Sequence, residues 1–218
     1  MEVWAGTAWN SLFTTVKLAA IAAPLCATLG LLIAWLLART RFTGQRSFEF
    51  GALLSFAIPG TVLGVSYILA FNKAPLILVG TGAIIVINYV IRELPVGVEA
   101  GIVSLRQIDP SIEEAAADLG ADVPTIFRTI VLPLVRPAFI SSLSYTFVRS
   151  MTAVSAVIFL ISAKWYHLTV QIYNFSECLR FGLASVLATA LILIVLATFG
   201  LLRLLVPKNV HLAKTLGR

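Results

Sequence analysis

Arg149 interrupts a stretch of the sequence, Pro137 to Ala163, that carries no other charge. A charged side chain in the middle of a membrane-spanning helix is costly, and it is tolerated where it faces protein or water. Ser142 and Thr146 precede Arg149 at helical spacing, so the three share one face. This stripe predicts either the lining of a transport pathway that attracts an anion or a chelated substrate, or a buried ion pair with Glu99 as the partner.

Pro59 and Gly60 lie inside another apolar stretch, which runs from Phe50 to Asn72. A proline there removes a helical hydrogen bond and kinks the chain, and freed carbonyls at membrane depth are tolerated only against protein or a cavity. The kink has two interpretations, a gate in a transport pathway or a fixed packing feature. Gly60 and Gly64 have the spacing of close helix contact, which suits packing.

Residues for catalysis or metal binding do not form a matching set. Tyr67, Tyr89 and Tyr145 are not placed to converge as oxygen ligands for iron, and we expect them to pack or to anchor at the membrane interface. His167 and His211 have no ligand partner at metal-binding spacing. The apolar stretches hold no His or carboxylate that would activate a Ser or Thr, so we expect neither an enzyme nor a metal site.

The basic character of the chain points to a membrane surface. Its net charge is +6, but the basic residues lie beside apolar runs and are not interleaved with exposed aromatic residues, which argues against nucleic acid as a partner. No glycine is followed by lysine, so the phosphate-binding P-loop is missing. We therefore expect no cofactor in this chain and no ATP hydrolysis by it.

The longest polar stretch, residues 92–136, predicts two short helices joined by a turn. Asp109 and the proline after it supply a helix start, and Ser111 with Glu114 has the spacing of a capping box. Gly120 is expected to end this helix in the left-handed conformation.

A second short helix is predicted to begin at Asp122 and Pro124 and to stop before Pro133. An ordinary amphipathic hairpin on the bilayer is the alternative interpretation. Acidic residues would be repelled by an anionic leaflet and suit a protein partner. The hairpin carries four of them, Glu113, Glu114, Asp118 and Asp122.

The elements that position these residues are membrane-spanning helices. The 218 residues are 59% hydrophobic and 12% charged, which is more apolar surface than one soluble core uses. A span needs about 20 apolar residues without a central charge. We predict an all-α integral membrane protein in a single domain, residues 1–218, with spans at about 12–38, 51–72, 75–94, 137–163 and 181–204 and a cytoplasmic loop at 106–136.

Lys and Arg gather on one side of these spans, and that side is cytoplasmic by the positive-inside rule. The prediction is therefore a periplasmic N-terminus and a cytoplasmic C-terminus. The start of the chain lacks a basic region and a cleavage site, so Met1 onward is expected to be retained. An odd number of spans with an outside N-terminus hints that a preceding helix or a fused half is absent. The outer side holds only Lys17, Lys73, Lys164 and Arg180.

The polar hairpin matches the pattern E-A-A-x3-G-x9-I-x-L-P at every position and resembles the EAA motif of binding-protein-dependent ABC importer permeases. The resemblance implies the MetI-like permease fold, and a coupling helix between the third and fourth spans that docks on an ATPase subunit. It also implies a second permease half, as an identical or different chain, and a periplasmic substrate-binding protein. The matching residues are Glu114, Ala115, Ala116, Gly120, Ile130, Leu132 and Pro133.

Four further segments resemble the C-terminal half of the permeases that import ferric iron. This resemblance implies a bacterial inner-membrane protein that passes ferric iron to the cytoplasm by alternating access, with specificity resting largely on the binding protein. Related permeases for 2-aminoethylphosphonate, thiamine, polyamines or sulfate are alternatives, and so is a non-transporting fragment or scaffold of a larger fused permease. The segments are 58–64, 70–72, 92–97 and 149–153.

Overall fold

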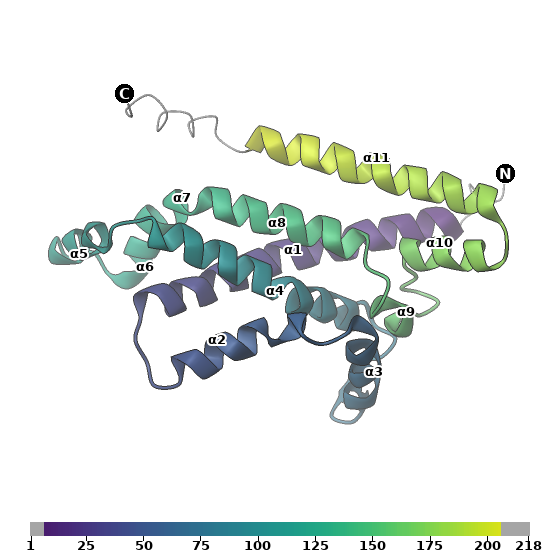
Figure 1. Ribbon diagram of the computed structural model, residues 1–218, viewed down its shortest axis with the longest axis horizontal. Coiled ribbons are helices and arrows are strands. Elements are labelled where there is room, and N and C mark those ends of the chain that lie inside the picture. Colours follow the sequence, from purple (N-terminus) through teal and green to yellow (C-terminus); the bar gives the residue numbers. More distant parts are fainter. Residues whose placement is uncertain (1–6, 206–218) are drawn as a thin grey trace.

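The computed structural model describes residues 7–205 and is almost entirely helical (Figure 1). A two-stranded antiparallel hairpin pairs Asn72 with Ile77. The elements in chain order are α1 (Thr7–Arg39), α2 (Gln45–Leu53), η2 (Leu54–Phe56), α3 (Gly60–Phe71), β1 (Asn72–Lys73), β2 (Leu76–Ile77), α4 (Gly82–Arg106), α5 (Pro110–Asp118), α6 (Val123–Ile126), η3 (Phe127–Val131), α7 (Leu132–Leu134), α8 (Arg136–Met151), α9 (Val157–Leu160), α10 (Leu168–Glu177) and α11 (Phe181–Leu205).

The centre of the molecule is a bundle of α1, α4 and α8, which lie side by side (Figure 1). Small residues let α1 and α4 approach closely. A Cβ atom built on Gly30 would lie 2.9 Å from the carbonyl carbon of Gly97, and one on Gly101 would lie 2.5 Å from the Cβ of Ala34. Both distances are below van der Waals contact, so Gly30 is required where the two backbones meet and Gly101 is required where α4 packs on the Ala34 side chain.

Two described helices are long and apolar enough to cross a membrane by themselves, Ala8–Arg39 and Phe181–Leu201. Two bent pairs reach that length together. Gln45–Phe56 meets Gly60–Phe71 at 107°, and Val123–Leu134 meets Arg136–Met151 at 72°. The number of membrane spans therefore stays a prediction, with α4 as the long central helix that carries charged residues along its length.

The helix bounds differ from the predicted spans in the middle of the chain. Residues 75–94 were expected to form one span, but the helix runs over Gly82–Arg106. The predicted span ended at residue 94, next to Arg92 and Glu93, because charge is costly in lipid, whereas Arg92 and the buried Glu93 face other parts of the protein. The residues before Gly82 form the β1–β2 hairpin instead.

Two other predicted spans are interrupted. The expected helix at 51–72 breaks at Pro59, which precedes α3 in an extended conformation rather than kinking a continuous helix. The expected helix at 137–163 ends at Met151, and α9 follows after a short break. Proline at position 59 supplies no backbone N–H for a continuing helix, which explains the first break.

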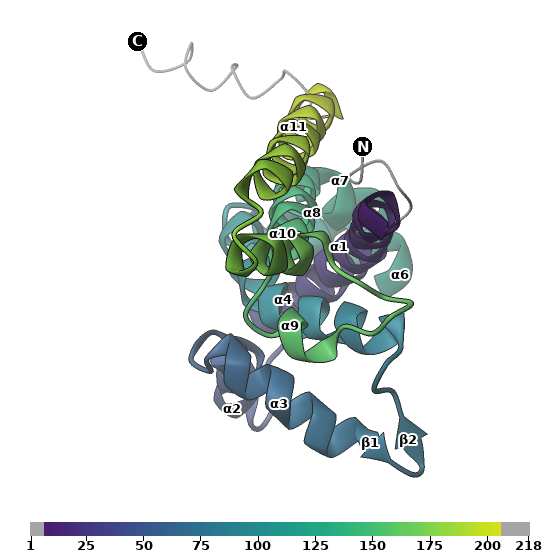
Figure 2. The same cartoon turned by 90° about the vertical axis from the view of Figure 1, so that its right-hand side faces the viewer.

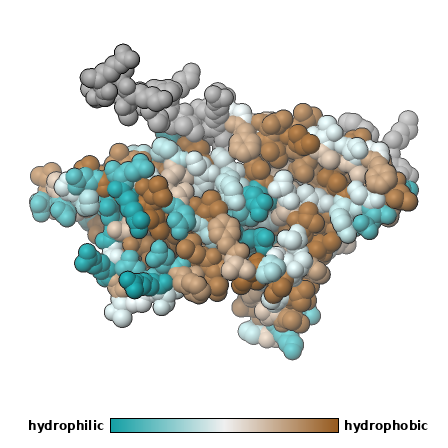
Figure 3. All heavy atoms as spheres, viewed as in Figure 1, coloured by the Kyte–Doolittle hydropathy of each residue, from teal (hydrophilic) through white to brown (hydrophobic). Residues whose placement is uncertain are grey.

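The surface divides by polarity. Figure 2 shows α11 on one side of the central bundle and α2, α3 and the β1–β2 hairpin on the other. Exposed apolar side chains cover both flanks, and hydrophilic residues gather at the end that carries α5 (Figure 3). On α11 the exposed apolar residues are Phe181, Val186, Ile192, Leu193, Leu196, Phe199 and Leu201, and on α3 they are Val62, Val65 and Leu69.

Candidate functional site

Residues 109–134 form two short helical arms that we call the EAA hairpin. The first arm, α5, begins at Asp109, whose carboxylate accepts a hydrogen bond of 3.0 Å from the backbone N–H of Ser111. This bond holds the pKa of Asp109 below its ordinary value. Asp109 is thus the cap, as predicted, whereas Ser111 lies inside the helix and does not form the expected capping box with Glu114. Pro110 has its ring in the first turn, which fixes the start of the helix there.

Gly120 forms the turn between the two arms, as predicted. Its φ is +88°, the left-handed region that favours glycine. The N–H of Ala121 donates to the carbonyl of Ala116 at 3.0 Å, and the N–H of Gly120 donates to Ala117 at 2.9 Å. This pair of bonds is the Schellman motif, so the free carbonyls at the end of α5 are satisfied locally.

The second arm starts at Asp122, whose carboxylate accepts from the N–H of Thr125 at 3.2 Å and whose pKa is lowered by that bond. The predicted stop before Pro133 is wrong. The arm continues from α6 through the π-helical turn η3 and into α7, where Pro133 occupies the first turn. A π-helical turn widens the backbone, which accommodates a proline that has no N–H to donate.

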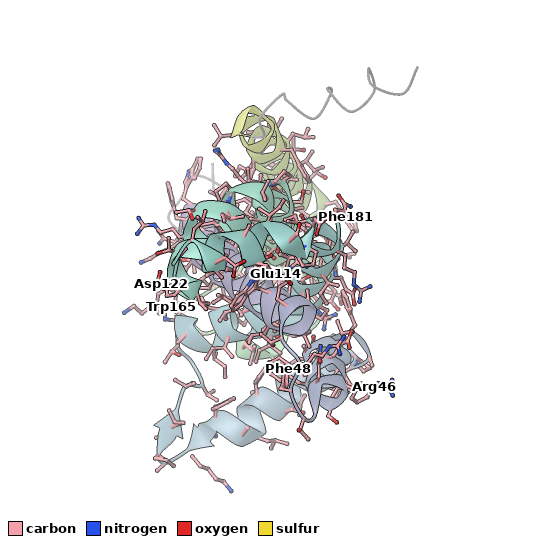
Figure 4. The ribbon with its side chains drawn as sticks, turned by 90° about the vertical axis from the view of Figure 1, so that its left-hand side faces the viewer. Arg46, Phe48, Glu114, Asp122, Trp165 and Phe181 are labelled. Carbon is pink, nitrogen blue, oxygen red and sulfur yellow. The ribbon has the colours of Figure 1, made fainter. Side chains whose placement is uncertain are left out.

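The two arms differ in burial. No residue of α5 is buried, and Leu119 at its end is 90% exposed. Figure 4 looks onto this end of the molecule, where Glu114 and Asp122 both lie. The second arm instead places Ile126 and Val131 in a core cluster with Leu105 of α4. The EAA hairpin therefore joins an exposed first arm to a second arm that is packed against the bundle.

Arg39 at the end of α1 ties the EAA hairpin to the bundle, and sequence reasoning missed this role. Its Nε lies 2.7 Å from Oε1 of Glu113, and its Nη2 donates to the carbonyls of Leu105 at 3.1 Å and Ile108 at 2.9 Å. The side chains of Arg39 and Glu113 are 13% and 14% exposed. One guanidinium thus connects α1, the end of α4 and the first turn of α5. A basic residue in the last turn of α1 and an acidic one in the first turn of α5 were the available signals.

Arg149 lies in a second polar region, beside α4. It is in the last turn of α8, and its side chain is half-exposed. Its Nε is 3.7 Å from Oε2 of Glu93, whereas the expected partner, Glu99, lines a different hollow on α4. The correction follows from α4 continuing past Arg92, which brings Glu93 to the level of Arg149.

Arg149 and Glu93 both line a cavity of about 270 Å³ that we call the polar pocket. Gly60 adjoins it from α3, because a Cβ there would lie 2.8 Å from Nη1 of Arg92 and would collide with the Ser155 hydroxyl. Gly60 and Arg149, predicted to belong to one pathway, therefore lie against the same group of residues. The lining is Asn88, Arg92, Glu93, Arg149, Thr152, Ala153, Val154, Ser155 and Ala156.

Ser142 and Thr146 do not share this setting. Both are buried, at 4% and 0% exposed, and the Ser142 hydroxyl lies against Gly97 of α4. The predicted polar stripe is divided: its first two members lie in the helix interface and Arg149 reaches the pocket. Helical spacing placed the three on one face but gave no information on which part of the face the neighbouring helix covers.

The remaining candidate residues take packing positions where the structure describes them. Tyr67 and Tyr89 lie in one hydrophobic cluster, and His167 is buried with its Nδ1 2.7 Å from the hydroxyl of Thr169. His211 lies outside the described residues. Over residues 7–205 no three His, Cys, Asp or Glu side chains lie together in a group that could hold a metal ion.

Comparison with known proteins decides the family. The family model described as "Binding-protein-dependent transport system inner membrane component" matches residues 7–211. The chain belongs to this family. The predicted resemblance and the predicted all-α membrane fold of ABC importer permeases are thereby confirmed.

Relatives of this permease include two ferric transport proteins. The ferric transport system permease protein FbpB of Actinobacillus pleuropneumoniae is 48% identical over 191 residues, which are 87% of this chain and 28% of that protein. The putative ferric transport system permease protein FbpB 1 of Haemophilus influenzae is 53% identical over 156 residues, 72% of this chain and 25% of that protein. The permease chain thus spans about a quarter of the length of both relatives.

A solved structure shares the fold of this permease. It is a bacterial ABC transporter involved in the import of the acidic polysaccharide alginate, with a TM-score of 0.77 and 14% identity. The match covers 94% of the permease chain described here and 82% of the chain in that structure.

Proposed function

We propose that this permease forms one half of the transmembrane pathway of an ATP-driven importer, and that an ATPase subunit acts on it through the EAA hairpin. The observation that carries the proposal is the Arg39 contact, which fixes an otherwise exposed arm to two helices of the bundle. A surface that receives force from a partner must be accessible to the partner and rigidly connected to what it moves. The EAA hairpin meets both conditions.

The contact surface is the exposed arm α5. Ala115 and Ala117 are small and exposed, so a groove on a partner can approach the helix backbone closely. Leu119 projects at the tip beside the Gly120 turn and offers an apolar anchor, while Glu114 offers a charge. An exposed apolar side chain surrounded by polar ones is typical of a docking surface.

Movement of α5 would reach the bundle through two connections. The Arg39 guanidinium joins α5 to α1 and α4, and Ile126 and Val131 pack the second arm against the same helices. ATP binding by two partner subunits would press the EAA hairpins of two permease halves together and switch the pathway by rigid-body motion, and hydrolysis would reset it. The partners in this scheme are ATPase subunits, a second permease half, as an identical or different chain, and a periplasmic substrate-binding protein; the scheme requires no cofactor and no catalytic site in the chain itself.

Ferric iron is the proposed cargo. The support is the identity of 48% and 53% with two ferric transport permeases. Uptake of radioactive iron by cells that lack their own ferric importer, with and without the complete transporter, tests the assignment. Uptake of 2-aminoethylphosphonate, thiamine, polyamines or sulfate and not of iron would contradict it.

The orientation that fits this scheme has the N-terminus in the periplasm and the EAA hairpin in the cytoplasm. Cysteine accessibility in intact cells checks it. A cysteine that replaces Thr43, in the α1–α2 connection, is expected to be protected from an impermeant reagent. Labelling of this cysteine would indicate the opposite orientation.

The docking experiment uses Leu119→Asp in the full chain, expressed with its second permease half and its ATPase. The substitution replaces an exposed side chain, so the permease is expected to stay folded in the membrane. Retention of the ATPase on the affinity-purified permease should fall about tenfold, the effect of removing one apolar anchor. Thr43→Asp, at an exposed position of the α1–α2 connection, is the matched control and should retain it.

A second candidate function rests on the length of the chain. Because the permease spans about a quarter of the relatives' length, a non-transporting fragment or scaffold of a larger fused protein is a defined alternative. Failure of the unaltered chain to retain any ATPase, even with a second permease half present, would favour it.

A further inference from the structure

We propose that the polar pocket is a binding site for a small multivalent oxyanion or polycarboxylate. The inference deepens the proposed function: cargo would pass this point as an anion, or as a metal ion coordinated by one, and not as a bare cation. The residues that line the pocket belong to α4, the end of α8 and the segment before α9, and Gly60 at the start of α3 adjoins them. Figures 1 and 2 show how these elements are arranged around α4.

The lining of the pocket carries more positive than negative charge. The pocket is lined by two guanidinium groups, Arg92 and Arg149, and by one carboxylate, Glu93. Glu93 is 4% exposed and already faces Arg149 at 3.7 Å, so the second guanidinium leaves an excess of positive charge. Positive charge in a partly enclosed site attracts anions and repels a bare trivalent cation.

Unpartnered polar atoms are the second argument. Asn88 is fully buried at the wall of the pocket, and among the described residues neither atom of its amide has a hydrogen-bond partner. Nη1 of Arg92 is buried and also lacks a partner within that part of the chain. Buried donors without acceptors are costly, and an oxygen-rich ligand in the pocket would satisfy them.

Geometry is the third argument. Gly60 has no side chain, and a Cβ atom at this position would meet Nη1 of Arg92 and the Ser155 hydroxyl. The glycine therefore lets a guanidinium and a hydroxyl lie together at the break between η2 and α3. Guanidinium groups bind phosphate and carboxylate oxygens through paired N–H donors, so this is a suitable set of donors for such an anion.

The ligand has two possible sources with the same chemistry. An oxyanion or a carboxylate can be the cargo itself, or it can accompany a ferric ion as its ligand. In both cases the oxygens of the anion, and not the metal, contact Arg92 and Arg149. The experiment separates the two sources by supplying the anion with and without iron.

The test uses the complete transporter in membrane vesicles with Cys178→Ser, which removes the exposed native cysteine; Cys26 is buried. Ser155→Cys and, separately, Thr152→Cys place a reactive thiol at exposed positions of the pocket lining. Each is labelled with a sulfonate-bearing and with a trimethylammonium-bearing methanethiosulfonate. The measured quantity is the ratio of the two rates, each divided by the rate of that reagent with a free thiol.

We expect the anionic reagent to be favoured by about tenfold, and Arg149→Gln or Arg92→Gln to reduce this preference several-fold. Arg46→Gln, an exposed arginine on α2 that does not line the pocket, is the matched control and should leave the ratio unchanged. A ratio at or below one overturns the proposal. Absence of labelling at both positions also overturns it, because a pocket closed to a sulfonate is closed to an oxyanion.

Protection completes the test. Sodium phosphate should slow labelling by the anionic reagent, and this effect should weaken in Arg92→Gln and Arg149→Gln. Protection by ferric citrate at lower concentration than by sodium citrate would identify the anion as a companion of iron, and equal protection would identify the anion itself as the species bound. Lack of protection by all three probes overturns the site. ATPase retention through the EAA hairpin is measured on the same preparations, so failure of the proposed function is recognised separately.

Discussion

The EAA hairpin and the polar pocket differ in whether their polar atoms have hydrogen-bond partners. In the hairpin, aspartates cap the starts of both helices, and N–H groups of the turn donate to the free carbonyls at the end of α5. Arg39 donates to Glu113 and to two backbone carbonyls. In the pocket, Asn88, Arg92 and Glu93 keep buried polar atoms without hydrogen-bond partners among the described residues. The first region is therefore a rigid unit whose polar atoms are already hydrogen-bonded, and the second region keeps polar atoms available for a ligand.

The largest expected effect comes from removing the contacts that Arg39 makes with the EAA hairpin and the end of α4. Arg39→Gln removes an ion pair and two charge-assisted hydrogen bonds and leaves Glu113 poorly solvated. The free energy of unfolding should fall by about 3 kcal/mol, measured by thermal unfolding in detergent. Glu113→Gln and the double variant complete a cycle, and additive effects of the two substitutions would contradict a direct coupling.

A different response is expected from the pocket. Glu93→Gln removes a carboxylate that offsets the two guanidinium charges, so the concentration of phosphate that gives half-protection of Ser155→Cys should fall about fivefold. Glu99→Gln is the control, since Glu99 lines another hollow of α4. Weaker protection in Glu93→Gln would mean that the carboxylate positions the arginines and does not merely oppose them.

Gly120→Ala probes the hairpin turn without introducing a collision. No atom lies within 4 Å of a Cβ built at this position, so the cost is the left-handed conformation alone, about 1 kcal/mol. The measurement is hydrogen exchange of the Gly120-adjacent amide of Ala121, which should become faster. Gly182→Ala, also in open space but without a positive φ, is the matched control.

The smallest expected effect concerns pH. The pKa values of Asp109 and Asp122 are lowered in the folded state from an ordinary value of 3.8, because each carboxylate accepts hydrogen bonds from the start of a helix. Their contribution to stability is therefore fully present above 3.8 and is lost as the pH falls through the lowered folded values. The protection factors of the Ser111 and Thr125 amides, which are corrected for the intrinsic pH dependence of exchange, should fall as the pH drops below 3.8, and Asp109→Asn should remove this fall at Ser111 only.

Prediction from sequence identified the hairpin turn but gave Arg149 the wrong ion-pair partner in the pocket, and the reason is physical. Gly120 and the aspartate-proline pairs act on residues within one helical turn, so local rules identify them. The capping box of Ser111 and Glu114 did not form because Asp109, two residues earlier, already caps the helix. The pairing of Arg149 with Glu93, in contrast, depends on how far α4 extends and where α8 ends.

Interruptions of the predicted spans follow the same logic. The charged pair Arg92 and Glu93 was taken to mark the end of the span at residue 94, but charge limits only contact with lipid, and α4 buries Glu93 against protein. The fold class was predictable because composition and apolar length suffice for it. The helix bounds were not, since they are set by which surfaces the helices cover in one another.

The close approach of Gly30 and Gly97 has a mechanical consequence. Where two backbones touch, no side chain can change rotamer to absorb sliding, so α1 and α4 are expected to tilt as one rod. Along α4, Arg106 and Glu93 are 13 residues apart, about 20 Å at 1.5 Å per residue. A tilt of about 5° pivoting at the Arg39 end would displace Glu93 by about 1.7 Å over that length, which is more than half of a hydrogen-bond distance. A small rotation at one end of the molecule is therefore enough to make or release ligand contacts at the other.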